Sequence, residues 1–417
     1  MRGFPSISLL LFSTIASGEH WPQWRGPGLD GVSHEKNLPV KWTATENIAW
    51  KLPMPAWTGA TPIIWGERIF LNVAEGDNIQ LWCVDRGNGK PIWKQPLSAG
   101  NVKMRKQNMS SPSPVTDGKS VWAMTGTGFL KAFDFDGKEL WSRDIQKDYG
   151  RFGLNHGYGS SPMLHEDSLY VQVLHGMQTD DPSYVLKIDK KSGKTAWRVE
   201  RPTKAVQESP DSYTTPMLAK VAKGLELIIS GGDAVTGHDI ATGKELWRGE
   251  GFNRDANPAY RVIASPLVYG DLVITPTRIR PLQAFRAGGK GDVTGNAIWK
   301  FDNGPDVPTP VTDGSLFYSI NDRGICWALK VQTGEEVYGG KRIKTGTYSA
   351  SPVLADGKIY ITSEDGVTTV LKAGPNFEVL AENSIDEYVL SSVAVSEGQI
   401  FLRGDKHLYC IGKRTRQ

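Results

Sequence analysis

The chain has 417 residues, with 46 glycines, 25 prolines and 14 tryptophans, and its formal net charge is only +3. Basic and acidic residues are interleaved, which excludes an extended basic surface for a polyanion such as nucleic acid. The three cysteines, Cys83, Cys326 and Cys410, are too sparse for a disulfide-stapled fold. We expect them to be small buried thiols, and a bridge between Cys83 and Cys410 remains the alternative.

The first 18 residues have the pattern of a secretory signal peptide. Arg2 supplies the positive start, an apolar stretch follows at 7–16, and small residues end it at Ala16-Ser17-Gly18. No cysteine follows that could carry a lipid, so we expect a periplasmic or secreted protein without membrane insertion. Residues 19–45 are predicted to be an N-terminal arm.

From residue 46 onward the chain repeats. Eight times a short apolar strand opens with a Ser-Pro- or Thr-Pro-like pair, at intervals of 40–54 residues. Proline cannot donate to a β-ladder, so it belongs at the first residue of a strand. A strand-built repeat of this length is typical of propeller blades. The pairs are Thr61-Pro62, Ser113-Pro114, Ser161-Pro162, Thr215-Pro216, Ser265-Pro266, Thr309-Pro310, Ser351-Pro352 and the degenerate Ser391-Ser392.

Each repeat continues as an antiparallel meander. Asp-Gly pairs such as Asp356-Gly357 separate two alternating β-branched runs, and this dipeptide tolerates the positive φ angles of a tight hairpin. The sequence therefore predicts an all-β protein, an eight-bladed β-propeller with four-stranded antiparallel blades.

A glycine four residues before an aromatic marks the outer strand of most repeats. The recurrence favours tryptophans that join neighbouring blades over tryptophans that stack on a ligand. These pairs are Gly89 with Trp93, Gly137 with Trp141, Gly193 with Trp197, Gly243 with Trp247, Gly295 with Trp299, and Gly334 with Tyr338.

The eighth repeat stops after its third strand, 408–411, and has no outer strand. An unpaired strand near the start, 47–52, carries Trp50 about one period before Trp93. We expect this N-terminal strand to complete the last blade, which removes open sheet edges. The propeller then spans residues 46–412, and residues 413–417 form a basic tail.

The segment Ile188-Asp189-Lys190-Lys191-Ser192-Gly193-Lys194-Thr195-Ala196-Trp197 and its counterpart ending at Trp247 resemble the tryptophan-docking repeat of pyrroloquinoline-quinone-like propellers. The leader Trp21-Pro22-Gln23-Trp24-Arg25-Gly26-Pro27 is similar to that of exported bacterial members. The resemblance implies a scaffold shared by quinoprotein dehydrogenases and by the propeller lipoprotein of outer-membrane assembly. It does not by itself imply a reaction.

Catalytic signatures are absent from the sequence. No two cysteines are adjacent, as they are in the alcohol-oxidising relatives, and no Cys-x-x-Cys-His could attach haem. The seven histidines have no ligand spacing. We therefore predict no catalytic residue, no metal and no cofactor. The alternative is an alcohol or sugar dehydrogenase that binds pyrroloquinoline quinone and Ca²⁺ in the central funnel.

A binding site would lie where loops enter the innermost strands, since these loops converge on one mouth of the channel. We interpret the protein as an exported, non-catalytic binding or scaffolding propeller of the bacterial envelope, for a protein or glycan partner. Arg261 and His156 together would favour an anionic ligand; otherwise these groups only solvate the channel. The candidate ligand contacts are Asn155, His156, Tyr158, Asp211, Tyr213, Arg261 and Tyr348.

Overall fold

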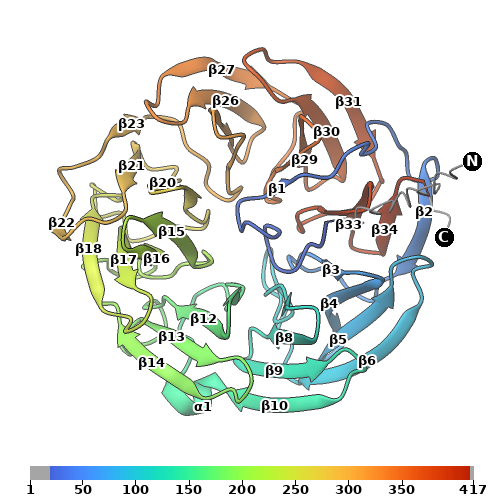
Figure 1. The fold of residues 1–417 in the computed structure, drawn as a ribbon, viewed down its shortest axis with the longest axis horizontal. Helices are drawn as coiled ribbons and strands as arrows, with labels where there is room; N and C mark the ends of the chain where they lie inside the picture. Colours follow the sequence, from blue (N-terminus) through green and yellow to red (C-terminus); the bar gives the residue numbers. More distant parts are fainter. Residues whose placement is uncertain (1–18, 414–417) are drawn as a thin grey trace, which may run out of the picture.

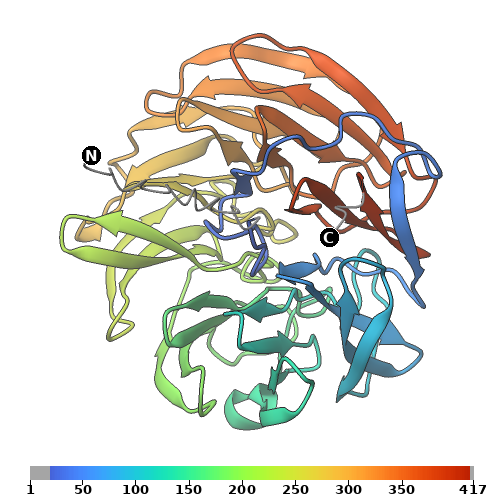
Figure 2. The same ribbon diagram turned by 45° about the vertical axis from the view of Figure 1, so that its right-hand side comes forward.

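The computed structural model describes residues 19–413. Eight sheets stand around a central axis, and within each sheet the strands follow one another from the axis to the rim (Figure 1). The turned view shows the same closed ring (Figure 2). The eight-bladed all-β propeller is confirmed. The predicted signal peptide and residues 414–417 of the predicted tail lie outside the described residues.

The blades are numbered here by their innermost strands in chain order. Blades 1 to 4 comprise β3 (Ile63–Trp65), β4 (Arg68–Glu75), β5 (Asn78–Asp85) and β6 (Pro91–Ser98); β7 (Val115–Thr116), β8 (Ser120–Met124), β9 (Phe129–Asp134) and β10 (Glu139–Asp144); β11 (Met163–His165), β12 (Ser168–Val173), β13 (Tyr184–Asp189) and β14 (Thr195–Glu200); β15 (Met217–Val221), β16 (Gly224–Gly231), β17 (Ala234–Asp239) and β18 (Glu245–Glu250).

Blades 5 to 8 comprise β19 (Leu267–Tyr269), β20 (Leu272–Thr275), β21 (Leu282–Arg286) and β23 (Trp299–Phe301); β24 (Val311–Thr312), β25 (Leu316–Ile320), β26 (Ile325–Lys330) and β27 (Glu336–Arg342); β28 (Val353–Ala355), β29 (Lys358–Thr362), β30 (Val367–Lys372) and β31 (Val379–Ser384); β32 (Ala394–Ser396), β33 (Gln399–Arg403), β34 (His407–Ile411) and β2 (Ile48–Pro53). Outside the blades lie β1 (Val32–Ser33), β22 (Gly291–Asp292) and the one helix of the described chain, α1 (Ile145–Tyr149).

The N-terminal strand completes the last blade. β2 pairs antiparallel with β34, and Trp50 lies opposite Cys410 in the register. This confirms the predicted closure. None of Cys83, Cys326 and Cys410 forms a disulfide, and all three are buried, so the bridge left open by the sequence is not formed.

Indoles join neighbouring blades, and the glycines of the repeat make room for them. Trp93 donates its indole N–H to Phe135 O of the next blade at 2.8 Å. A Cβ at Gly193, whose φ is +69°, would lie 2.7 Å from the Trp141 ring. The same overlap recurs in other blades, so the glycine serves both a left-handed turn and the close approach of the preceding blade's indole. The further pairs are Trp50 on Gly89, Trp93 on Gly137, Trp197 on Gly243 and Trp299 on Gly334.

Trp247 is the exception among these indoles. It donates its N–H to Glu226 Oε2 in its own blade at 2.8 Å, and Gly288 N donates to the same oxygen at 2.9 Å. The connection that contains Gly288 also carries β22, which pairs in parallel with β18. Trp247 therefore contacts the following repeat through this connection, and no ring lies over Gly295.

Candidate functional site

A ring of side-chain hydroxyls surrounds the channel axis, and the Ser-Pro and Thr-Pro pairs of the sequence form it. Ser113 N donates to Ser161 Oγ of the next blade at 2.9 Å. Equivalent bonds of 2.9–3.0 Å join most successive blades: Thr61 N to Ser113, Thr215 N to Ser265, Ser265 N to Thr309, Thr309 N to Ser351, and Ser351 N to Ser392. In each pair the hydroxyl residue thus ties one blade to the next.

The ring also corrects the register of the eighth repeat. Ser392, rather than Ser391, accepts the N–H of Ser351. Val393 therefore stands where the other repeats have proline. Ser391 instead donates its hydroxyl to Arg403 O at 3.0 Å.

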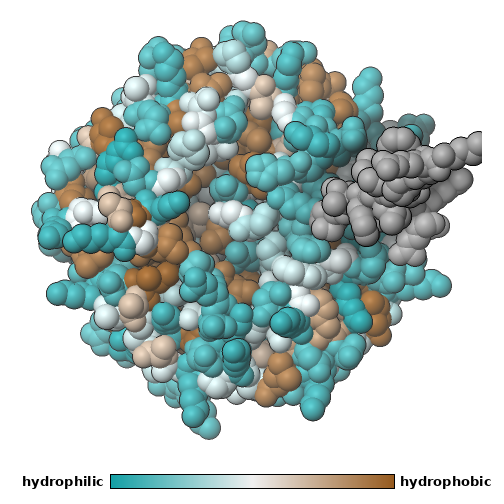
Figure 3. Space-filling model, in the orientation of Figure 1, coloured by the Kyte–Doolittle hydropathy of each residue, from teal (hydrophilic) through white to brown (hydrophobic). Residues whose placement is uncertain are grey.

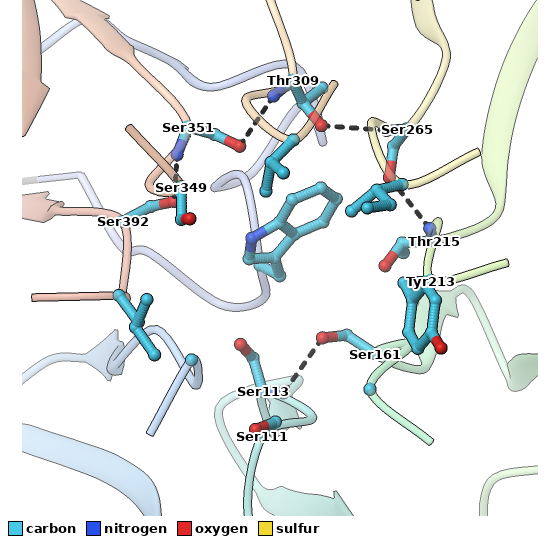
Figure 4. Close-up of a pocket in the computed structure, with 16 residues that line it drawn as sticks. Ser111, Ser113, Ser161, Tyr213, Thr215, Ser265, Thr309, Ser349, Ser351 and Ser392 are labelled. Carbon is cyan, nitrogen blue, oxygen red and sulfur yellow. Dashed lines mark hydrogen bonds between the residues drawn. The ribbon is translucent and has the colours of Figure 1, made fainter. Parts of the chain in front are cut away.

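The hydroxyls line a cavity of about 120 Å³ on the axis (Figure 4). Trp24 is also part of its lining. A second tier of channel-lining residues lies two positions earlier in each blade. The lining residues are Trp24, Gly59, Ser111, Ser113, Gly159, Ser161, Tyr213, Thr215, Ile263, Ser265, Val307, Thr309, Ser349, Ser351, Leu390 and Ser392.

Trp24 belongs to the arm that precedes β2, drawn in dark blue across the middle of the ring in Figures 1 and 2. The next residue, Arg25, donates its guanidinium N–H groups to Pro352 O, to Pro310 O at 2.7 Å and to Asp30 O at 2.9 Å. Burial lowers the pKa of Arg25 to about 10, so the side chain remains charged at neutral pH.

The arm is fastened to blades on both sides of the ring. Trp21 forms a backbone bridge with Ile64 of blade 1. β1 pairs in parallel with β28 of blade 7. Because the arm meets the innermost strands near their final residues, it closes the channel at the mouth opposite the loops that lead into those strands.

The loops at the other mouth bring several predicted site residues together around one carboxylate, Glu208. Glu208 Oε1 lies 3.0 Å from Arg261 Nη1 and 3.2 Å from His156 Nε2, and it accepts from Asn155 Nδ2 at 3.3 Å. Burial, followed by the nearby Arg261 charge, lowers the pKa of His156. The cluster is therefore an Arg–Glu pair with a neutral imidazole beside it at pH 7.

Asp211 holds the loops of this cluster in place. It is fully buried and accepts from Asn155 N at 2.7 Å, Gly176 N at 3.0 Å and Met177 N at 3.1 Å. Burial outweighs these donors and raises the pKa of Asp211 to about 6. Tyr213 lines the channel cavity, and its hydroxyl accepts from His156 N at 3.2 Å.

The two other predicted contacts are buried away from the cluster. Tyr158 is 1% exposed and donates to Gln172 O at 3.0 Å. Tyr348 is fully buried and donates to Lys344 O at 2.6 Å. Both hydroxyls thus satisfy loop or strand carbonyls.

Residues that the prediction did not include cross the same mouth. Lys106 Nζ lies 2.6 Å from Glu364 Oε1 of blade 7 and 3.4 Å from Ser349 Oγ. The neighbouring Gln107 donates to His156 O and Gly157 O, next to blade 3. Blades 3 and 7 face each other across the axis, so residues 106–107 cross the mouth. No sequence motif marks this loop.

A quinone with Ca²⁺ does not fit the channel cavity. Pockets for ligands of that size usually measure about 300–1,000 Å³, and this cavity measures about 120 Å³. Ca²⁺ requires several oxygen ligands, usually with carboxylates among them, and no carboxylate lines the cavity. Residues 19–413 contain no group of three His, Cys, Asp or Glu residues placed to hold a metal ion.

Comparison with known proteins identifies the family. A family model described as outer membrane protein assembly factor BamB matches residues 32–152 and 126–291, which together are more than half of the chain. The chain belongs to this family. The resemblance to pyrroloquinoline-quinone-like propellers is thereby confirmed.

The BamB of Alkalilimnicola ehrlichii is 27% identical over 145 residues, which are 34% of this chain and 32% of that relative. The BamB structure from Moraxella catarrhalis superimposes with a TM-score of 0.62 at 13% identity, over 89% of this chain and 98% of that one. A europium-containing methanol dehydrogenase superimposes with a TM-score of 0.68 at 12% identity, over 93% and 90%. At these identities the two structures show a common fold, shared by an assembly factor and an enzyme.

No helix within residues 19–413 is long and apolar enough to cross a membrane. The face shown in Figure 3 mixes hydrophilic and hydrophobic residues, as the interleaved charges of the sequence predicted.

Proposed function

We propose that this protein is an exported, non-catalytic scaffold of the bacterial envelope that binds a protein partner on the loop face, the face around Glu208 and Lys106. The family match supports an envelope protein, because the family is described by an outer-membrane assembly factor. The apolar start of the sequence supports export. The partner is a proposal, since the matched segment covers about a third of the curated relative.

The observation that carries the proposal is an exposed apolar rim beside a self-neutralised charged cluster. Met177 is 44% exposed, and its backbone N–H is bound by Asp211. Val206 is 50% exposed and lies two residues before Glu208. Val102 is 51% exposed on the loop that crosses the mouth. Apolar side chains and arginine together are typical of protein-binding surfaces, and the paired charges avoid a repulsive approach.

A protein partner accounts for these features better than a glycan does. His156 and Arg261 both bind Glu208 already, which leaves fewer polar groups free for the hydroxyls of a glycan. The three exposed apolar side chains would gain free energy only by burial against another apolar surface.

The test uses a double variant of the loop face. A partner is first captured by crosslinking in envelope fractions and then purified. Met177→Asp with Val206→Asp is expected to lower the affinity for this purified partner by at least about tenfold. Val379→Asp, at a 41% exposed position of β31 on the outer rim, is the matched control and is expected to bind normally. Equal binding by the double variant would exclude the loop face, and selective loss of an oligosaccharide would favour a glycan.

A further inference from the structure

The channel cavity presents hydrogen-bond donors that have no acceptor. Six ring hydroxyl oxygens each accept a backbone N–H from the preceding blade. A hydroxyl has one proton to donate, and none of these six protons has an acceptor among the described residues. All six residues line the cavity and are at most 7% exposed: Ser113, Ser161, Ser265, Thr309, Ser351 and Ser392.

Thr215 is a seventh donor and the least constrained. It is 3% exposed and lines the cavity. Its backbone N–H donates to Ser265 Oγ, but its own hydroxyl forms no hydrogen bond within residues 19–413. Figure 4 shows this hydroxyl on the channel side of the ring. The Thr215 hydroxyl lines the cavity and is not among the fully buried atoms without a partner, so it is available to an ion or to water in the channel.

The charge beneath the cavity is positive. The Arg25 guanidinium carbon lies 5.9 Å from the centre of the Trp24 ring. Its hydrogen bonds go to backbone carbonyls, and it makes no ion pair among the described residues. At the opposite mouth the Lys106 charge is neutralised by Glu364. Asp30, whose backbone carbonyl accepts from Arg25, also has its carboxylate charge near the guanidinium. Arg25 is thus a cation beside the cavity, partly offset by Asp30, and no carboxylate lies in the lining itself.

We propose that the channel binds one small oxyanion, of the size of acetate or phosphate, above Trp24. Converging hydroxyl donors and a nearby cation are the groups that stabilise such an ion, because hydrogen bonds to a charged acceptor are the stronger ones. The cavity of about 120 Å³ has room for several waters and therefore for one small oxyanion. The ion enters from the loop face, because the arm fills the other mouth.

Two isosteric variants test whether binding depends on a hydroxyl that lines the cavity or on ring hydroxyls in general. Thr215→Val removes a donor that lines the cavity and disturbs no hydrogen bond of its hydroxyl. Thr61→Val is the control at the equivalent ring position: the Thr61 hydroxyl is fully buried and has no partner among the described residues, and Thr61 does not line the cavity. Both variants retain the backbone N–H that donates to the next blade.

The experiment is calorimetric titration of the purified full chain with acetate and, separately, with inorganic phosphate, at constant ionic strength in chloride. One bound ion per chain is expected. Thr215→Val should bind it about tenfold more weakly, because one charge-assisted hydrogen bond is lost. Thr61→Val should bind it with unchanged affinity. The proposal is overturned if neither ion saturates up to about 50 mM, which would mean a channel filled by water alone. It is equally overturned if the two variants weaken binding alike.

Discussion

Trp50 lies on Gly89. The indole of the strand that closes blade 8 donates its N–H to Arg86 O in blade 1 at 2.7 Å, and its ring covers the Cα of Gly89. The joint between the last and the first blade is therefore the same joint that connects Trp93 to Gly137 and Trp141 to Gly193. Further contacts cross this joint: Arg86 of blade 1 binds Glu397 and Gln399 of blade 8. Arg403 of blade 8 donates to Asn72 O of blade 1 at 2.6 Å.

This joint predicts that replacing a glycine under an indole by any other residue destabilises the protein. Gly137→Ala places a methyl group 2.9 Å from the Trp93 ring and imposes a positive φ of 87° on alanine. We expect a loss of about 2–5 kcal/mol in the free energy of unfolding, from left-handed backbone strain and overpacking together. Urea denaturation followed by circular dichroism measures it.

Gly76→Ala is the control for Gly137→Ala, because Gly76 has a φ of +60° and open space where the Cβ would stand. It should lose only the backbone contribution, about 1–2 kcal/mol. Equal losses at the two positions would mean that the indole does not set the requirement for glycine.

The buried pair of Trp247 and Glu226 predicts different losses in the free energy of unfolding for two substitutions of Trp247. Trp247→Ala removes a fully buried indole and is expected to cost about 3–5 kcal/mol. Trp247→Phe retains most of the ring but leaves Glu226 Oε2 with Gly288 N as its remaining donor, at an expected cost of about 1–3 kcal/mol. Thermal and urea unfolding of both variants give the order, and a loss under about 1 kcal/mol for Trp247→Ala would contradict the packing role.

Asp211 predicts a pH dependence of stability. Its pKa is about 6 in the folded chain, above the value of about 3.9 in an unfolded chain. The folded state therefore holds this proton more tightly, and the group's stabilising contribution is present below pH 4 and lost as the pH rises through 6. Urea midpoints measured from pH 4 to pH 7 should show a smaller decline for Asp211→Asn than for the wild type.

Asp189→Asn is the opposite case. Hydrogen bonds from Ser192 lower the pKa of Asp189, so its contribution is present above the unfolded pKa and is lost on acidification. The stability difference between the wild type and Asp189→Asn should therefore shrink below pH 4 and stay constant between pH 4 and pH 6. If the urea midpoints of Asp211→Asn and the wild type fell equally between pH 4 and pH 7, protonation of Asp211 would not contribute to stability.

The cavity predicts how the protein responds to the quinone of its fold relatives. Adding pyrroloquinoline quinone with Ca²⁺ should leave the melting temperature unchanged, because the cavity is too small and no carboxylate lines it. Differential scanning fluorimetry measures this directly. A saturable shift together with dye reduction in the presence of an alcohol would establish the dehydrogenase instead.

The repeats predicted the blades and their closure because each blade repeats the same local signals, so Trp50 could be matched to Trp93 by period alone. The role of the serines and threonines could not be predicted in this way. The N–H that each hydroxyl accepts belongs to the neighbouring repeat, 41 to 52 residues away in the sequence. Trp24 and Arg25 have no counterpart in the repeats, so nothing placed them at the axis.

The candidate site was predicted in part. Loop position brought Asn155, His156, Asp211, Tyr213 and Arg261 to one mouth, which the structure places around or beside Glu208. Tyr158 and Tyr348 were selected for the same reason, but their hydroxyls find backbone carbonyls inside the fold. Residue type alone does not distinguish these two environments.

The arm also constrains when the molecule can reach its final form. Arg25 binds carbonyls of Pro310 and Pro352, and Gly31 O accepts the N–H of Leu354. During synthesis those partners emerge from the ribosome some three hundred residues after the arm. The arm can therefore dock on the propeller only after nearly all of the protein has been synthesised.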